Sequence, residues 1–172
     1  MTLNEVDTKI YCVGVNHRTA PSAYRERIYL EDQELVKRLL KIKPDYPNGE
    51  LFALSTCNRF EIFIASNHHE ELSQQNLTEL FNKVQQDGQT TNQELEPEDL
   101  DKHLYFHTQK SAIQHFIHVT SSLDSMVVGE TQITGQVKKA LELMKEHTFS
   151  GPIIERLGQV ALHATKAIRN NT

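Results

Sequence analysis

The chain has 172 residues, 38% of them hydrophobic and 24% charged, which is enough to bury the core of a single globular domain. Its formal net charge of −5 argues against a domain that holds nucleic acid by bulk electrostatics, although it leaves room for a local basic face. The sequence has no apolar run long enough to span a membrane and a polar beginning, so we expect a soluble cytoplasmic protein.

Strands and helices alternate in the predicted first half. Short apolar runs predict strands over Lys9–Asn16, Glu50–Ser55 and Phe60–Ala65. Helical spacing of apolar residues predicts helices over Glu31–Ile42 and Glu70–Gln86. This order predicts a small sheet with helices packed on it.

The second half is predicted to be wholly helical from Pro97 on, after a polar loop over Asp87–Pro97. One helix follows the capping residue Ser111, and a second covers Gln132–His147. A third begins at Pro152, a favourable first helical residue, and continues to the end of the chain. Its apolar stripe has no predicted partner in this chain, so we expect it to pack against something else.

A basic run lies in and just after the predicted helix over Glu31–Ile42. Lys37, Arg38, Lys41 and Lys43 could form a local basic face, but such a run is more often the solvated side of a helix.

Two cysteines are present, about 45 positions apart and without a CxxC pattern, so we expect reduced thiols and no structural zinc. Cys12 lies inside an apolar strand and is predicted to be a buried filler. Cys57 lies in a loop between two strands, with Arg59 two residues later. It is either a buried hydrophobic residue or a nucleophile whose thiolate Arg59 could stabilise; Arg59 could also bind a substrate carboxylate.

Polar residues are dense over Ser111–Ala140, which includes the predicted helix after Ser111 and the start of the one at Gln132. His115 is more often a hydrogen-bonded core or surface residue than a catalyst at such a position. Glu130 or Thr131 can cap the helix that begins at Gln132. Capping does not explain Gln136, which shares a helix face with Gln132.

Several cofactor motifs are absent from the sequence. It contains neither GxGxxG after a strand nor GxxxxGK[ST], so no nucleotide cofactor site is predicted. Four histidines, His103, His107, His115 and His118, lack any HExxH or Cys/His pairing, so no metal site is predicted.

Three segments together resemble the glutamyl-tRNA reductase family. They are GVNHRTAP (Gly14–Pro21), STCNR with its following glutamate (Ser55–Glu61) and LDSMVVGETQITGQVKKA (Leu123–Ala140). The resemblance covers essentially the whole chain but only the first part of the family's enzymes. It implies a catalytic domain over 1–150 and, over 151–172, the start of the long helix that leads to a nicotinamide-binding domain and a dimerisation domain.

The resemblance also implies a reaction and a set of site residues. Cys57 would attack the ester of glutamyl-tRNA, and NADPH would reduce the resulting thioester to glutamate-1-semialdehyde for tetrapyrrole synthesis. His115 would polarise the carbonyl or handle the leaving group's proton, with His107 as a rival that the motif spacing disfavours. The implied substrate-binding residues are Thr56, Asn58, Arg59, Ser125, Glu130, Thr131, Gln132 and Gln136.

Cofactor and partners follow from the same resemblance. NADPH would be used by the full-length enzyme, with no cofactor site in this chain, which alone would bind the substrate and hydrolyse it through the thioester. The expected partners are glutamyl-tRNA, the downstream aminomutase and, only in the full-length enzyme, a second copy; no membrane is expected.

The implied fold is α+β: a ferredoxin-like small antiparallel sheet covered by helices, followed by a helical segment. Two positions depart from the family pattern. Ser122 replaces a common glycine, and Phe60 stands where a small polar residue is usual. Two other functions remain open: a non-enzymatic module that binds glutamyl-tRNA or a partner, and a generic cysteine hydrolase using Cys57 and His115.

Overall fold

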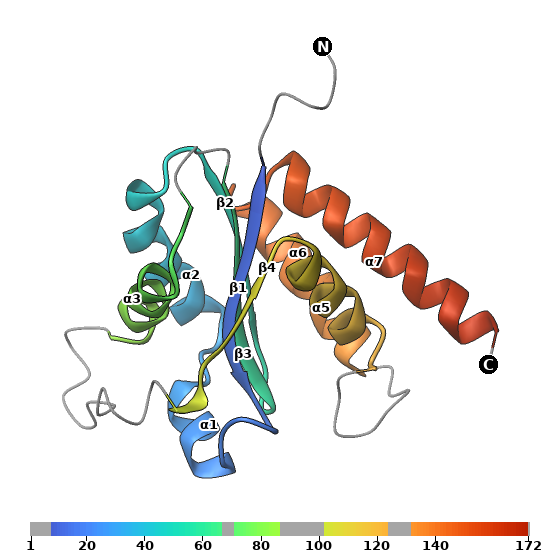
Figure 1. Ribbon diagram of the computed structural model, residues 1–172, viewed down its shortest axis with the longest axis horizontal. Coiled ribbons are helices and arrows are strands. Elements are labelled where there is room, and N and C mark those ends of the chain that lie inside the picture. The colour runs from blue at the N-terminus through green and yellow to red at the C-terminus, as the bar shows by residue number, and fades with distance from the viewer. Residues whose placement is uncertain (1–7, 67–70, 87–101, 124–131, 172) are drawn as a thin grey trace.

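The core is a four-stranded antiparallel sheet (Figure 1). The computed structural model describes residues 8–66, 71–86, 102–123 and 132–171. The strands lie in the order β2-β3-β1-β4, with bounds β1 Lys9–Asn16, β2 Gly49–Ser55, β3 Arg59–Ser66 and β4 Tyr105–Thr108. With helices between β1 and β2 and between β3 and β4, this is the ferredoxin-like arrangement, so the α+β prediction is confirmed.

Helices cover both faces of the sheet. In Figure 1, α2 and α3 lie on one side of the strands and α5, α6 and α7 on the other. Every residue of β3 is buried, as expected for a strand covered on both faces. The helix bounds are α1 Ser22–Ile28, α2 Asp32–Ile42, the short 3-10 helix η1 Lys43–Asp45, α3 Gln74–Gln85, α5 Lys110–Thr120, α6 Gln132–Glu146 and α7 Pro152–Asn170.

The prediction that the chain is wholly helical beyond Pro97 is wrong. β4 covers Tyr105–Thr108 and pairs with β1, where Gly14 lies opposite Tyr105. Four residues are too few for an alternating pattern, and β4 exists because β1 offers it an edge. The short helix α1 was also not predicted. The predicted loop over Asp87–Pro97 lies outside the described residues.

Local capping sets where α3 begins. The Oγ atom of Ser73 accepts a hydrogen bond from the backbone N–H of Asn76 at 3.1 Å, and the Oδ1 atom of Asn76 accepts one from the N–H of Ser73 at 3.0 Å. This reciprocal pair is a capping box, so the helix begins at Gln74 and not at the predicted Glu70.

The last helix, α7, has partners within the chain, although Val160 of its apolar stripe is 39% exposed, so the expectation that this stripe packs against something else stays a prediction. It contacts α5, α6 and β2, and it buries Ile154, Leu157 and Ala161. Its first turn is held by the carboxylate of Glu50 on β2. That carboxylate accepts hydrogen bonds from the N–H groups of Gly151, Ile153 and Ile154 at 2.6, 3.1 and 2.9 Å. The division into 1–150 and 151–172 stays a prediction.

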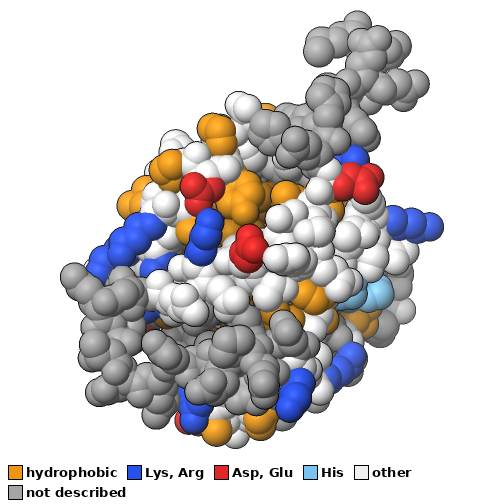
Figure 2. Space-filling model, turned by 60° about the vertical axis from the view of Figure 1, so that its left-hand side comes forward, with side chains coloured by type: hydrophobic (Ala, Val, Ile, Leu, Met, Phe, Trp, Pro, Cys, Tyr) orange, Lys and Arg blue, Asp and Glu red, His pale blue; other side chains and the backbone are white. Residues whose placement is uncertain are grey.

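The predicted basic run does not form a continuous basic surface. Arg38 is buried, where it donates hydrogen bonds to Glu34 and to the carbonyls of Val84 and Gln85. Lys43 donates to the carbonyl of Gly49. The space-filling view that brings α2 and α3 forward shows Lys and Arg side chains interspersed with acidic, neutral and hydrophobic ones (Figure 2).

The two departures from the family pattern lie at buried positions. Ser122 is buried with a φ of 70°, in the left-handed region that favours glycine. Phe60 is fully buried and packs edge-to-face against Phe81 of α3, with ring centroids 5.6 Å apart. None of the helices in the described part of the chain is long and apolar enough to cross a membrane.

Candidate active site

A tight turn between β2 and β3 presents Cys57. The Oγ1 atom of Thr56 accepts hydrogen bonds from the N–H groups of Asn58 and Arg59, both at 3.2 Å, and the N–H of Thr56 donates to the carbonyl of Arg59 at 2.9 Å. These contacts bury Thr56 and leave Cys57 exposed as a free thiol. Cys57 is therefore not a buried filler. An exposed thiol on a braced turn is accessible to a substrate carbonyl.

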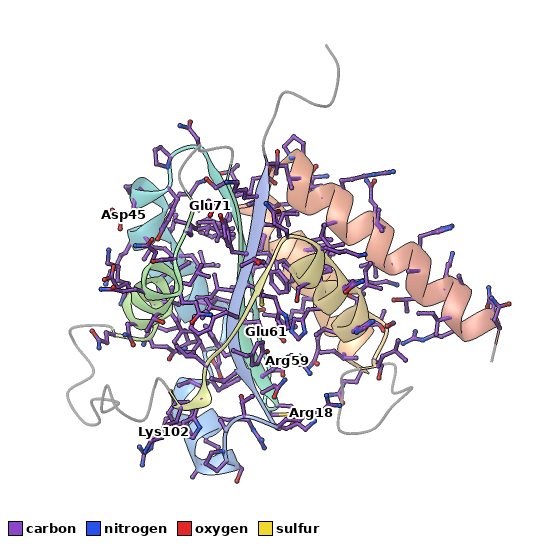
Figure 3. All side chains as sticks on the ribbon, in the orientation of Figure 1. Arg18, Asp45, Arg59, Glu61, Glu71 and Lys102 are labelled. Atoms are coloured by element: carbon purple, nitrogen blue, oxygen red, sulfur yellow. The ribbon has the colours of Figure 1, made fainter. Side chains whose placement is uncertain are left out.

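The GVNHRTAP segment lies next to this turn. Asn16, at the end of β1, is paired with Arg59, at the start of β3. Its Oδ1 atom accepts hydrogen bonds from the N–H groups of Arg18 and Thr19 at 2.9 and 3.3 Å, which turns the chain after the strand. Arg18 and Arg59 consequently lie at the same end of the sheet (Figure 3). Two motifs about 40 residues apart in sequence thus share one end of the sheet.

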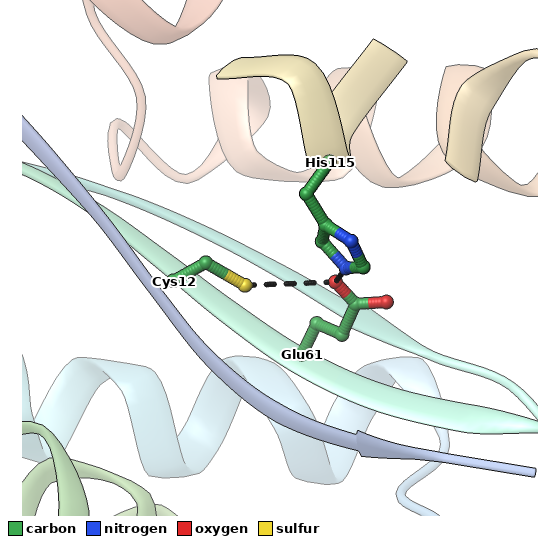
Figure 4. Close-up of side chains that lie close together, drawn as sticks. All are labelled: Cys12, Glu61 and His115. Carbon is green, nitrogen blue, oxygen red and sulfur yellow. Dashed lines mark hydrogen bonds and ion pairs between the residues drawn. The ribbon is translucent and has the colours of Figure 1, made fainter. Parts of the chain in front are cut away.

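A buried ion-pair network lies directly behind the turn. One carboxylate oxygen of Glu61, Oε1, accepts from Nη1 of Arg59 at 2.5 Å. The other, Oε2, lies 2.7 Å from Nε2 of His115 (Figure 4). The side chains of Arg59, Glu61 and His115 are only 2%, 0% and 9% exposed. One carboxylate therefore fixes both the arginine and the histidine of the predicted site.

The charges of this network keep Glu61 ionised. Burial alone would raise its pKa, but the charges of His115 and Arg59, and their hydrogen bonds, outweigh burial and lower the pKa from 4.5 to about 2. An ionised carboxylate can accept hydrogen bonds from both partners, so it holds their side chains in fixed orientations.

Room for Glu61 comes from Gly14, its neighbour on β1. The two residues are opposite each other in the sheet. A Cβ atom on Gly14 would lie 2.7 Å from the carbonyl oxygen of Phe60 and 2.8 Å from Cγ of Glu61. The glycine of the GVNHRTAP segment is thus needed because the Glu61 side chain lies across its Cα.

Cys12 also faces this network. As predicted, it is completely buried. Its Sγ atom lies 3.6 Å from Oε2 of Glu61, to which the thiol donates. Burial and the negative charge of Glu61 raise the pKa of the Cys12 thiol well above its usual value, so Cys12 is not an activated nucleophile.

Ring contacts fix the orientation of the His115 imidazole. Phe63 and His107 stack on it with centroids 6.3 and 4.3 Å away, and Tyr105 lies edge-on at 5.3 Å. Nδ1 of His107 is 2.6 Å from Oγ of Ser111. Of the two candidate histidines, His115 is the one that contacts Glu61.

The structure groups some predicted residues and leaves others apart. Thr56, Asn58 and Arg59 form one turn, and Glu61 links Arg59 to His115. In the first turns of α6, Gln132 is exposed and Gln136 half-buried. Three predicted residues, Ser125, Glu130 and Thr131, lie outside the described residues.

The sequence reasoning missed Glu61 as a site residue. The feature that could have indicated Glu61 is a carboxylate within the apolar run FEIFIA, which directly follows STCNR. A charged residue at such a position requires a buried partner.

Comparisons with known proteins show the family to which the chain is similar. Residues 13–172 match the family model described as the N-terminal domain of glutamyl-tRNA reductase. The glutamyl-tRNA reductase of Thermodesulfovibrio yellowstonii is 35% identical over 161 residues, 93% of this chain and 37% of the relative. That of Heliobacterium mobile is 37% identical over 163 residues, 95% of this chain and 35% of the relative.

A solved structure shares the fold. Glutamyl-tRNA reductase from Methanopyrus kandleri superimposes with a TM-score of 0.72 at 23% identity, covering 95% of this chain and 35% of that one. The chain thus spans little more than a third of the proteins that it matches. On the match to the family model, it belongs to the family of glutamyl-tRNA reductase N-terminal domains.

Proposed function

We propose that this chain carries the thioester-forming step of glutamyl-tRNA reduction, as the catalytic domain of that enzyme in tetrapyrrole synthesis. The single observation that carries the proposal is the exposed Cys57 on a braced turn in front of the Arg59–Glu61–His115 network. The Cys57 thiolate attacks the ester carbonyl that joins glutamate to tRNA. The new C–S bond replaces the C–O bond, and the ribose oxygen leaves with a proton.

His115 handles the proton of this step. Its Nε2 atom is held by Glu61, and its ring is stacked between Phe63 and His107, so its orientation is fixed before substrate binds. Glu61 is a positioning residue: it contacts Arg59 and His115 and, being fully buried, acts through them.

Arg59 binds the carboxylate of the glutamyl group. A guanidinium has five N–H donors in a planar fork. The carboxylate of Glu61 accepts from Nη1 and holds the guanidinium in place. Thr56 and Asn58 shape the turn, and Ser125, Glu130, Thr131, Gln132 and Gln136 bind the remaining polar groups of the substrate.

The rest of the reaction belongs to the remainder of the enzyme. NADPH would supply the hydride that reduces the thioester to glutamate-1-semialdehyde, and residues of the longer enzyme would hold it. In its absence water takes the place of hydride and releases glutamate. We also propose that dimerisation requires the longer enzyme, that the downstream aminomutase is a partner, and that the protein acts in the cytoplasm.

Release of glutamate from glutamyl-tRNA by the purified chain tests this function. The wild-type chain should release glutamate much faster than the uncatalysed reaction, and Cys57→Ser should lose this activity. Cys12→Ser is the matched control, because it removes the buried thiol and keeps the exposed one. Equal release by wild type and Cys57→Ser would refute the nucleophile, and binding without release by either would favour the binding module.

A further inference from the structure

Three potential metal ligands meet behind the active-site turn. Sγ of Cys12, a carboxylate oxygen of Glu61 and a ring nitrogen of His115 all lie within 4.8 Å of one another, and all three residues are buried (Figure 4). They come from β1, β3 and α5. Because the three residues lie far apart in the sequence, they form no metal-binding motif, and no metal site was predicted from the sequence.

One of the ligand distances already matches a tetrahedral ion, and a second lies close to it. Bond lengths of zinc to sulfur, nitrogen and oxygen place tetrahedral sulfur and oxygen ligands about 3.6 Å apart, and nitrogen and oxygen ligands about 3.3 Å apart. Cys12 Sγ and Glu61 Oε2 are already 3.6 Å apart. His115 Nε2 and Glu61 Oε2, at 2.7 Å, would have to separate by about 0.6 Å, which is a small side-chain movement.

We propose that Cys12, Glu61 and His115 form a binding site for a zinc-like divalent ion, and that the bound ion switches off the proposed reaction. The inhibition rests on the proposed function, because the ion takes the same His115 nitrogen and Glu61 oxygen that position the site. Binding itself does not rest on it.

The chemistry of the ligands selects the ion. As the ion binds, the Cys12 thiol proton and the Nε2 proton of His115 both leave to solvent, and the thiolate sulfur and the Nε2 lone pair then bind the ion. The ion must compete with protons for a buried thiol, which favours zinc, cobalt or cadmium over magnesium or calcium.

The surroundings complete the site. Arg59 stays on the other oxygen of Glu61, as the outer hydrogen-bond partner that ligating carboxylates normally have. Three protein ligands leave the fourth position of the ion for a water molecule. Of the three ligand residues, only His115 has any exposure, so the ion enters from its side.

Cobalt absorption tests the site directly. Co²⁺ added to the chelator-treated 172-residue chain should give a thiolate-to-cobalt charge-transfer band with tetrahedral ligand-field absorption. The band should persist in Cys57→Ser and be lost in Cys12→Ser, and in Cys12→Ala if the serine variant does not fold. The proposal is overturned by a band that is lost in Cys57→Ser and kept in Cys12→Ser, or by no band in the folded wild-type chain.

Zinc inhibition is measured separately. Glutamate release by each protein is compared with and without Zn²⁺, relative to its own metal-free rate. Release by wild type should fall at least tenfold and release by Cys12→Ser should not. Equal inhibition of both would contradict the switch. If wild type and Cys57→Ser release glutamate equally without metal, the proposed function fails, whereas the cobalt result still decides the site.

Discussion

At the scale of single residues, Glu61 organises the site. It is fully buried, it accepts from Arg59 and His115 through different oxygens, and it lies over Gly14. An ionised carboxylate at this depth is stable only while both partners remain. Its substitution therefore affects the stability of the fold and the orientation of both partners together.

Acid should reveal how much Glu61 stabilises the fold. Its pKa is lowered from 4.5 to about 2 on folding, so its contribution is present in full above pH 4.5 and is lost as the pH falls toward 2. The contribution is on the order of 3 kcal/mol. In urea titrations, the difference in unfolding free energy between wild type and Glu61→Gln should shrink across this range. A difference in unfolding free energy that stays constant between pH 5 and 2 would contradict this role of the ionised Glu61.

Gly14→Ala should disturb the network by steric crowding, without changing any charge. The added Cβ meets a backbone oxygen and the Glu61 side chain at less than 3 Å, which should lower the unfolding free energy by about 1–3 kcal/mol and reduce glutamate release. Gly135→Ala is the matched control, because nothing lies within 4 Å of its Cβ position on α6. It should raise stability by up to about 1 kcal/mol. Equal effects of the two substitutions on unfolding would argue against crowding.

At the scale of elements, the strands and helices that could be predicted are those whose own residues carry an apolar pattern. The runs over Lys9–Asn16 and Phe60–Ala65 predict β1 and β3 within one residue at each end. β4 could not be predicted, because its four residues form a strand only where β1 provides an edge. The partners of α7 were also missed, because they depend on how the helices fold back onto the sheet.

The contact between Glu50 and α7 is testable. The Glu50 carboxylate accepts from three N–H groups of the first turn, where a negative charge is favoured. Glu50→Gln should lower the unfolding free energy by about 1–2 kcal/mol, measured by urea denaturation. Glu71→Gln removes one exposed carboxylate, which pairs with Lys9, and should change stability by less than about 0.5 kcal/mol. A similar loss of unfolding free energy in both variants would show that removing any negative charge has this effect and that the contact with α7 is not responsible.

At the scale of the whole molecule, the fold brings separate segments to one end of the sheet. The end of β1, the β2–β3 turn, the end of α5 and the start of α6 lie there together (Figure 1). The family resemblance implied Cys57, Arg59 and His115 one by one, with His115 outside the three matching segments. The sequence could not predict that Glu61 joins Arg59 to His115. Which residues of α5 contact which residues of β3 is decided only when the helix packs on the sheet.

The central claim is that Cys57 forms a covalent bond with the glutamyl group. The most direct measurement is the intact mass of the chain after brief incubation with glutamyl-tRNA and acid quenching, followed by peptide mapping. The account predicts the mass of one glutamyl group added on Cys57, removable by hydroxylamine and absent from Cys57→Ser. Glutamate release by wild type without any adduct, or an adduct on Cys12 instead, would contradict it.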